Sequence, residues 1–503
     1  MHGGPVPEPL HRVGMDDWMA ALAAHFRAMR RRYPNDRLMI LFDIDGTILD
    51  MRYMVCHTLK AYDTAHGTHF FDHLQPGAID VHEDHVPRLL AELEIRPLDQ
   101  QAILDWYLEN RWTREAVLRS HQPYEGVFDV IRWFQIQPNC AVGLNTGRPE
   151  SIRAETLDSL NRLGAPHRVR FRDELLHMNP DGWQHNVQDA KVAGVLAFQQ
   201  QGYRIFAVID NEPENLAAIS ALNAAREFLL LHANTIFESK RSLLPPGALS
   251  GDRYDLTELI SPRSLPREVD LVWHGVNDDA NLRQFLASDI VWGECDIHRD
   301  ARSGELVLHH DELAEASAED ADEWLRLDDL LNRLARAGKS VKLDLKAGPE
   351  LIEPVLALVD RHGFSDDRLW FNAYIPLMGE AGFRRLAEAH PGAVLQAPID
   401  FLEPLVVSVP DKTHDLLQTF CSWGLNRFSI DWRCRQRGPF FDRMEAWGLE
   451  VNLYGVTDLH SFLQAILLLP RSVTADFNFP KWHHYGRGSG QRGVYYEYEL
   501  RRP

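Results

Sequence analysis

Short apolar runs alternate along most of the chain with longer segments in which apolar residues recur every three or four positions. The first helical pattern covers residues 15–32 and leads directly into an apolar run that ends in an acidic turn. Strands that alternate with helices predict a parallel, Rossmann-like sheet covered by helices on both faces. The three clearest strands of this first half are RLMILFDI at 37–44, CAVGLNT at 140–146 and RIFAVID at 204–210.

A long helical insertion separates the first two of these strands. Its pattern, over about residues 51–135, predicts a helical cap above the edge of the sheet. Five of the seven histidines in the insertion show no regular helical spacing, and we expect these five to be exposed to solvent. They are His66, His69, His73, His82 and His85.

The second half of the chain has a different repeat. Residues 238–267 are rich in Pro, Ser and Gly and predict a linker between a first domain, 1–237, and a second, 268–503. Eight apolar runs separated by helical segments then predict a (β/α)₈ TIM barrel. These runs are LVWH, IVWGECDI, VKLDLK, LWFNAYI, AVLQAPI, RFSIDW, EVNLYGV and VTADF.

Composition and charge narrow the function. A chain of 503 residues with 45% hydrophobic and 25% charged residues is typical of a multidomain globular protein. The formal charge of −20 disfavours nucleic acid and other polyanions as partners. Five scattered cysteines, no signal-like segment and no long apolar stretch predict a cytoplasmic protein without integral membrane association. The sequence does not indicate an oligomeric state.

The first candidate site follows the first strand, in LFDIDGT. Asp43 and Asp45 lie two residues apart at the carboxyl end of the strand, so both can face the crevice where parallel sheets bind ligands. One carboxylate can attack phosphorus while the other handles the proton. Gly46 allows a tight turn, and Thr47 offers a hydroxyl and backbone donors beside a phosphate.

Residues 38–235 resemble the haloacid dehalogenase-like (HAD) phosphatases through four short motifs. The resemblance implies Asp43 of DIDGT as the nucleophile that forms a phosphoaspartate and Asp45 as general acid and base. Thr146 of LNTGRPE would hold a phosphate oxygen, and Lys191 of QDAKVAG would neutralise charge. Asp210 of FAVIDNEPEN would complete a Mg²⁺ site with the Asp43 carboxylate and the Asp45 carbonyl.

Two details of this first site stay open. The family often has a second acid after the last aspartate, whereas here Asn211 follows, with Glu212 and Glu214 close behind. Any of the three could support the metal. Arg148 could contact phosphate or substrate, or be a solvated loop residue. Asp45 itself favours phosphoryl transfer to water, because a leaving alcohol needs a proton.

The second candidate site lies at the carboxyl ends of the predicted barrel strands, the face where barrel enzymes carry their chemistry. Three carboxylates suit a hard divalent cation, and two histidines could act as general acid and general base on a phosphodiester. These six residues are His274, Glu294, Asp296, His310, Asp344 and Lys346.

Residues 268–480 resemble the glycerophosphodiester phosphodiesterase-like barrels of the phospholipase C type, and the run VWHGVNDDANLRQFLASDIVWGECDIH resembles menorin-like domains. The resemblance implies an acid–base pair, three ligands of Mg²⁺ or another divalent cation, and a phosphate clamp, with Asn372 facing the substrate. By this resemblance, His274 and His310 would be the acid–base pair. Glu294, Asp296 and Asp344 would be the metal ligands, and Lys346 would be the phosphate clamp. The chain departs from the family in having HGVN where the phosphodiesterases have HRG. Strand alternation would send only one of the adjacent His309 and His310 inward. We expect it to be His310, because Asp311 follows it as in the HD pair of the phosphodiesterases that this segment resembles.

Two hypotheses follow. The first is a bifunctional, metal-binding hydrolase for small-molecule phosphate esters, in which the barrel opens a phosphodiester and the first domain removes phosphate from the product. The second is a HAD-type phosphatase with a single activity, whose barrel is a non-catalytic module that binds an anionic ligand.

Overall fold

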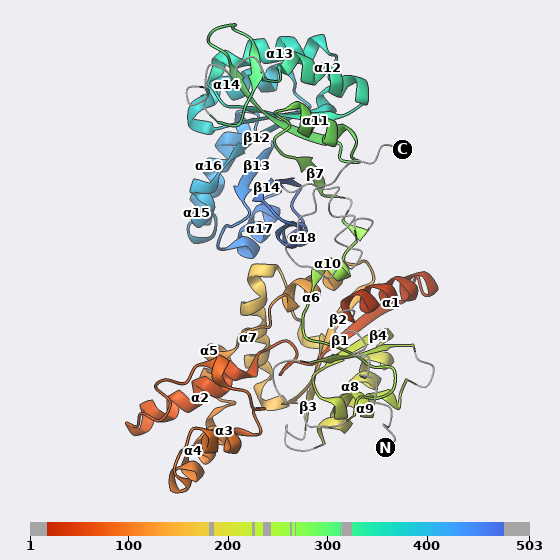
Figure 1. Cartoon of the computed structure of the whole chain (residues 1–503), viewed down its shortest axis with the longest axis vertical. Helices are drawn as coiled ribbons and strands as arrows, with labels where there is room; N and C mark the ends of the chain where they lie inside the picture. Colours follow the sequence, from red (N-terminus) through yellow and green to blue (C-terminus); the bar gives the residue numbers. More distant parts are fainter. Residues whose placement is uncertain are drawn as a thin grey trace, which may run out of the picture. The chain divides into compact units, whose positions relative to one another are not determined.

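The computed structural model describes residues 18–180, 186–223, 227–234, 243–261, 264–266, 268–311, 313 and 324–476. The chain divides into two compact units, residues 1–259 and 260–503 (Figure 1). The first three residues of the predicted helix at 15–32, and Phe477 of the last predicted strand, lie outside the described residues.

The first unit is built on a six-stranded sheet in which every paired strand runs parallel, in the order β3-β2-β1-β4-β5-β6. The three strands predicted from sequence are β1, β2 and β4, and β1 lies between the other two. This confirms the predicted α/β fold. The strands are β1 (Arg37–Phe42), β2 (Cys140–Pro149), β3 (Leu176–Asn179), β4 (Tyr203–Asp210), β5 (Leu229–Ala233) and β6 (Leu249–Gly251).

Successive apolar side chains of β1 and β4 point to opposite faces of the sheet and are buried on both. On one face, Phe26 of α1 packs against Phe134 of α6 and Phe206 of β4. On the other, Met39 and Leu41 join the core formed with α8 and α9. The helices are α1 (Trp18–Arg32), α6 (Val127–Gln135), α7 (Arg153–Gly164), α8 (Val187–Gln200) and α9 (Pro213–Ser220).

Four helices of the predicted insertion pack on one another and project from the sheet as a cap (Figure 1). The Asp50 carboxylate accepts a hydrogen bond from the Arg52 N–H and so caps the first of them. The remaining helix of the insertion, α6, packs against β2, so it covers the sheet and is not part of the cap. The cap helices are α2 (Met51–His66), α3 (Val86–Glu92), α4 (Pro97–Asn110) and α5 (Arg114–Ser120).

Part of the segment predicted as a linker is folded into the first unit. Strand β6 extends the sheet beside β5, and the short helix α10 (Leu256–Leu259) packs on α1 and α6. Between them, the buried Tyr254 hydroxyl donates to the Thr47 carbonyl at 2.8 Å. Residues 249–259 therefore support the turn that carries the first candidate site.

The second unit is the predicted barrel. Eight parallel strands close on themselves through the pairing of β7 with both β8 and β15. The short β9 (Leu306–Leu308) adds antiparallel to β8. The barrel strands are β7 (Asp270–Trp273), β8 (Trp292–Arg299), β10 (Ser340–Leu345), β11 (Leu369–Ala373), β12 (Val394–Pro398), β13 (Arg427–Asp431), β14 (Glu450–Val456) and β15 (Ser472–Ala475).

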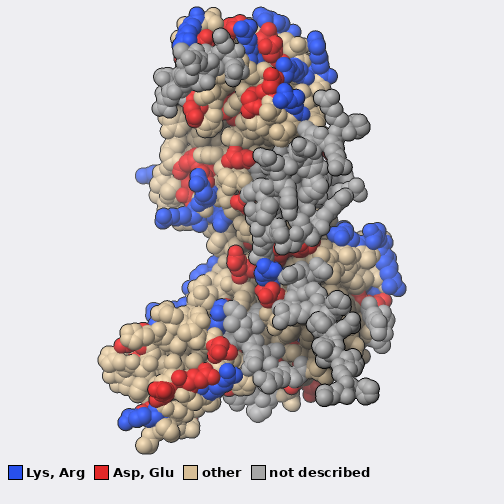
Figure 2. All heavy atoms as spheres, viewed as in Figure 1, with Lys and Arg blue, Asp and Glu red and all other residues tan. Residues whose placement is uncertain are grey.

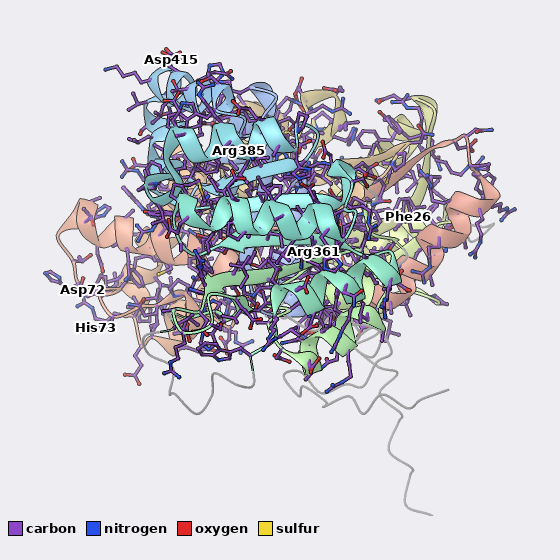
Figure 3. The ribbon with its side chains drawn as sticks, turned by 90° about the horizontal axis from the view of Figure 1, so that it is seen from above. Phe26, Asp72, His73, Arg361, Arg385 and Asp415 are labelled. Atoms are coloured by element: carbon purple, nitrogen blue, oxygen red, sulfur yellow. The ribbon has the colours of Figure 1, made fainter. Side chains whose placement is uncertain are left out.

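Amphipathic helices surround these strands. Charged residues such as Arg361, Arg385 and Asp415 lie on their outer side (Figure 3). None of the described helices is long and apolar enough to cross a membrane. The helices are α11 (Asp279–Leu286), α12 (Leu327–Ala337), α13 (Ile352–Arg361), α14 (Ile375–Ala389), α15 (Glu403–Ser408), α16 (Pro410–Ser422), α17 (Arg437–Ala446) and α18 (Leu459–Leu467).

Candidate phosphate-ester sites

The four motifs of the first unit meet at the carboxyl edge of its sheet. Asp43 follows β1, Thr146 lies on the neighbouring β2, and Asp210 ends β4 on the other side. Lys191 of α8 reaches between two of them, with its Nζ 2.6 Å from Asp43 Oδ1 and 2.6 Å from Asp210 Oδ2. All four side chains are buried. The structure therefore brings together these four sequence-predicted residues.

The charges of this cluster are strongly coupled. Burial raises the pKa of Asp43 to about 8; the Lys191 ammonium opposes this rise, and Asp210 and Asp45 add to it. Burial alone would lower the pKa of Lys191, but the carboxylates of Asp210 and Asp43 hold it above its usual value. A further positive charge beside Asp43 would favour the carboxylate form that a nucleophile needs.

Three potential ligand atoms converge at the Asp43 oxygen that faces away from Lys191. They are Asp43 Oδ2, the Asp45 carbonyl oxygen and one terminal atom of the Asn211 side chain. One terminal atom of the Asn211 carboxamide lies 3.1 Å from Asp43 Oδ2 and 2.9 Å from the Asp45 carbonyl oxygen. If this atom is nitrogen, both contacts are hydrogen bonds; if it is oxygen, three oxygens surround one point, as they do around Mg²⁺. The donor set therefore fits a divalent cation. Gly46 has φ +74°, and a Cβ there would lie 2.4 Å from Asn211, so this turn requires glycine.

Asp45 is held by Arg148. The Arg148 guanidinium donates to both Asp45 oxygens, at 2.7 Å from Nε and 2.6 Å from Nη2. It also contacts Thr156 and His121, and only 1% of its surface is exposed. Arg148 is therefore a buried part of the site, and its interpretation as a solvated loop residue is wrong.

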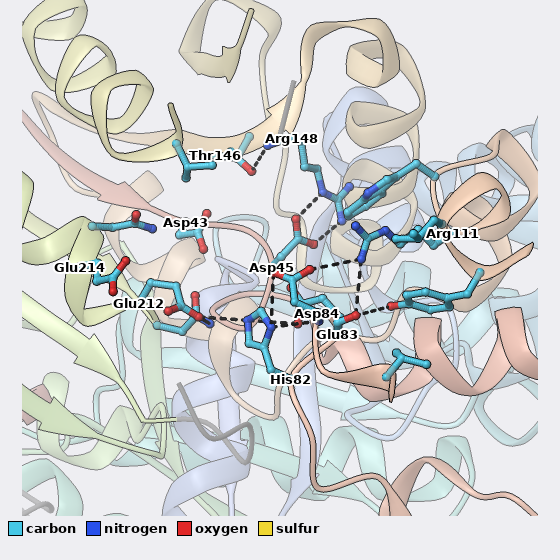
Figure 4. Close-up of a pocket in the computed structure, with 18 of the residues that line it drawn as sticks. Asp43, Asp45, His82, Glu83, Asp84, Arg111, Thr146, Arg148, Glu212 and Glu214 are labelled. Atoms are coloured by element: carbon cyan, nitrogen blue, oxygen red, sulfur yellow. Dashed lines mark hydrogen bonds and ion pairs between the residues drawn. The ribbon is translucent and has the colours of Figure 1, made fainter. Parts of the chain in front are cut away.

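The site opens into a cavity of about 530 Å³ between the sheet edge and the cap (Figure 4). Of the five histidines predicted to be exposed, four are exposed, but His82 is buried. Its Nε2 lies 3.0 Å from Glu212 and 3.4 Å from Glu83. The expectation of exposure is therefore wrong for His82, because the cap folds this residue against carboxylates of the sheet and of its own loop.

The His82 cluster is electrostatically unusual. Burial would lower the pKa of His82, but Glu83, Glu212 and Asp84 raise it to about 9. Burial raises the pKa of Glu83 to about 7, although His82 opposes this rise. The neighbouring Arg111 has Nη1 3.4 Å from Asp84 Oδ1. The cap therefore places a protonated histidine and paired charges in the wall of the cavity.

In the barrel, one ligand atom from each of Glu294, Asp296 and Asp344 lies within 4.8 Å of the others. Glu294 and Asp296 share one face of β8, and Asp344 pairs in register with Asp296 from the adjacent β10. This is the only group of three or more His, Cys, Asp or Glu ligands that the described residues form at such distances. Three oxygen ligands fit a hard divalent cation.

Lys346 lies within the same cluster. Its Nζ is 2.9 Å from Asp296 Oδ1 and 2.7 Å from Asp344 Oδ2. Asn372 donates to Asp344 at 2.8 Å. Burial alone would lower the pKa of Lys346, but the carboxylates of Asp344 and Asp296 hold it above its usual value. The amine is therefore a fixed positive charge beside the carboxylates, where a phosphate would need one.

The two barrel histidines lie beside each other. The ring centroids of His274 and His310 are 6.1 Å apart. His274 Nδ1 forms an ion pair with Asp476, and its Nε2 lies 3.7 Å from Glu294. His310 is largely exposed and paired with Asp311 at 2.8 Å. Burial alone would lower the pKa of His274, but the carboxylates of Glu294 and Asp476 raise it to about 9.

Sequence patterns did not identify several residues of the two sites. In the first site these are His82 and Glu83, and in the barrel they are Asp476 and Asn277, which donates to Asp296 at 2.6 Å. The only local signal for the cap residues is the run of four consecutive polar residues at 82–85. Their burial depends on contacts with distant strands.

No protein-family model matches the chain, and no match was found among curated proteins. Solved structures similar in fold include glycerophosphodiester phosphodiesterases from Parabacteroides distasonis and Agrobacterium tumefaciens. The first has 13% identity, covers 44% of this chain and 99% of its own, and has a TM-score of 0.34. The second has 17% identity, coverages of 41% and 96%, and a TM-score of 0.30.

A HAD-superfamily hydrolase of subfamily IA from Geobacter sulfurreducens is also similar, with 10% identity, coverages of 43% and 92%, and a TM-score of 0.29. Such identities and scores carry no argument about activity.

Proposed function

We propose that the first unit is a Mg²⁺-dependent phosphomonoester hydrolase that works through an aspartyl-phosphate. The observation that carries the proposal is the position of Asp43 at the floor of a cavity, with Lys191 at 2.6 Å and Thr146 on the adjacent strand. A buried carboxylate beside a fixed ammonium and a hydroxyl is suited to attack a phosphate, because the ammonium offsets the phosphate charge and the hydroxyl can donate a hydrogen bond to it.

In the proposed reaction an Asp43 oxygen attacks phosphorus, and the bond from phosphorus to the alcohol oxygen breaks. Asp45 gives a proton to the leaving oxygen, then takes one from a water that attacks the aspartyl-phosphate and releases phosphate. Because Arg148 contacts both Asp45 oxygens, this pair must open at least partly when Asp45 turns to the substrate. Thr146 and Lys191 orient the phosphate.

A bound Mg²⁺ would supply positive charge next to the transferred phosphate. The Asp43 carboxylate, the Asp45 carbonyl and Asn211, together with Asp210, would hold it. Of the three residues left open by the sequence, Asn211 is favoured because its carboxamide faces Asp43 and the Asp45 carbonyl.

The test uses the full chain, Mg²⁺ and p-nitrophenyl phosphate. Asp43→Asn keeps the shape of the side chain but removes the nucleophile, and we expect kcat to fall by about 10³-fold or more. Asp36→Asn, an exposed carboxylate at the other end of β1, is the matched control and keeps full activity. Hydrolysis that survives Asp43→Asn would contradict the proposal.

We further propose that the barrel is a metal-dependent phosphodiesterase whose product is a substrate of the first unit. The proposal is supported by the three-carboxylate group beside Lys346 and by the adjacent rings of His274 and His310. Cleavage of a diester leaves a monoester, which is the kind of substrate that the first site takes. The two sites would then act in sequence on one compound.

Bis-p-nitrophenyl phosphate tests the barrel. His274→Ala should remove diesterase activity and leave the monoesterase unchanged, and Asp43→Asn should do the reverse. Complete absence of diesterase activity would favour the second hypothesis, in which the barrel only binds an anionic ligand. In that case affinity for the diester, measured by calorimetry, should survive loss of both His274 and His310.

A further inference from the structure

The cavity above Asp43 has more acidic than basic groups. Six carboxylates and four basic side chains line it. The carboxylates are Asp43, Asp45, Glu83, Asp84, Glu212 and Glu214, and the basic residues are His82, Arg111, Arg148 and Lys191. A metal ion and a phosphate dianion carry opposite charges of equal size, so the acidic excess remains when both are bound.

Each basic group of the cavity already has a carboxylate partner. Lys191 contacts Asp43, and Arg148 contacts both oxygens of Asp45. In the cap, His82 lies 3.0 Å from Glu212 and Arg111 lies 3.4 Å from Asp84. A second anionic group on the substrate would therefore meet, among the described lining residues, only cations that are already neutralised.

On the cap side, three carboxylates share two basic groups. Glu83, Asp84 and Glu212 lie 3.4, 3.8 and 3.0 Å from His82. Asp84 also contacts Arg111, and Glu83 is 6% exposed. Asp84 is exposed to the cavity (Figure 4). Burial of Glu83 beside these acids raises its pKa to about 7, and a positive charge nearby would relieve this.

Part of the cap wall is apolar, from Val86, Leu104 and Leu108, and Gln101 also lines it. Such a wall suits a short carbon chain between the phosphate and the acidic end of the cavity. We infer that the first unit takes phosphate monoesters whose alcohol part carries a positively charged nitrogen, held by Glu83 and Asp84. This inference rests on the proposed phosphatase function and adds the class of its substrate.

The experiment compares four monoesters with the full chain and Mg²⁺. Phosphoethanolamine and phosphocholine are cationic, glycerol 3-phosphate has a neutral alcohol, and phosphoglycolate is anionic. We expect kcat/KM for the cationic pair to exceed that for the neutral ester by about 10-fold and that for the anionic ester by about 100-fold. A primary ammonium that donates hydrogen bonds would favour phosphoethanolamine, whereas charge alone would leave the two cationic esters equal.

Variants test the assigned residues. Glu83→Gln and Asp84→Asn should each lower the ratio of cationic to neutral kcat/KM by about 10-fold. Asp84→Asn should also raise kcat/KM for phosphoglycolate, because the carboxylate beside Arg111 is removed. Glu92→Gln removes an exposed cap carboxylate outside the cavity and should leave every ratio unchanged. Melting temperatures of the variants show whether the cap stays folded.

The outcomes separate the two proposals. Hydrolysis of p-nitrophenyl phosphate without preference for cationic esters, or a preference that both variants retain, would overturn this inference and leave the phosphatase standing. A chain that hydrolyses none of the monoesters, p-nitrophenyl phosphate included, would overturn both.

Discussion

At the scale of single residues, the first site is defined by pairs of opposite charge. Asp43 and Asp210 share Lys191, and Asp45 is held by Arg148. A bidentate guanidinium fixes both position and orientation of a carboxylate, which a single ammonium cannot do. We therefore interpret Arg148 as a positioning residue for Asp45.

Arg148→Lys tests this role. Lysine keeps the charge but loses the fork, so we expect kcat for p-nitrophenyl phosphate to fall by about 10- to 100-fold while KM changes less. The pH profile of kcat should also shift, because Asp45 meets a different partner. Arg153→Lys, at a partly exposed ion pair with Glu150, serves as the control. An unchanged kcat and pH profile would contradict the role.

His82 makes a pH-dependent contribution to stability. Its folded pKa, about 9, lies above the ordinary histidine value of 6.5, so its stabilising effect is fully present below about pH 6.5 and lost as the pH rises through 9. We expect His82→Gln to destabilise the first unit by about 2 kcal/mol at neutral pH and by much less at pH 10. Thermal unfolding across this range measures the difference, with the exposed His85→Gln as control. A loss of stability independent of pH would refute the assignment.

At the scale of elements, the segment that contains β6 and α10 supports the DIDGT turn from more than two hundred residues away. Tyr254 packs on Trp18 and donates to the Thr47 carbonyl. The neighbouring Gly126 has φ +78°, and a Cβ there would lie 2.3 Å from the Tyr254 carbonyl oxygen. Tyr254 is thus closely packed both at its ring, against Trp18, and at its backbone carbonyl, against Gly126.

Tyr254→Phe removes only the hydroxyl and leaves the Thr47 carbonyl without this donor. We expect the first unit to lose about 1–2 kcal/mol of unfolding free energy. A modest fall in kcat should accompany it, because the turn carries Asp43 and Asp45. Tyr53→Phe, at a residue 40% exposed on the cap, should change neither quantity. Equal behaviour of the two variants would show that the Tyr254 contact does not support the site.

At the scale of the whole molecule, each candidate site is made entirely from residues of one unit. Acidic and basic side chains are interspersed among the described residues of the face shown in Figure 2. Because the two units have separate cores, loss of one site should leave the other intact.

Metal binding tests this independence. Titration calorimetry of the full chain with Mg²⁺ should show two classes of site, of which Asp43→Asn removes one and Asp296→Asn the other. The two losses should add in a double variant, since no ligand is shared. A single class of site, or loss of both on one substitution, would contradict the assignment.

The sequence by itself determined the two folds and most of the motif residues. Apolar periodicity predicted β1, β2, β4 and the eight barrel strands, because side chains on a buried strand must be apolar whatever surrounds it. Motif residues at strand ends could be grouped because parallel strands bring their carboxyl ends to one edge.

Only the tertiary structure decided which other polar residues join the sites. Arg148 lies 103 positions from Asp45, and His82 meets Glu212 across the cavity between cap and sheet. Such contacts leave no periodic pattern in the sequence. A polar residue looks the same there whether its partner in the fold is water or a distant carboxylate. The same holds for β6, whose three residues are too few to show a period and form a strand only because β5 has an open edge.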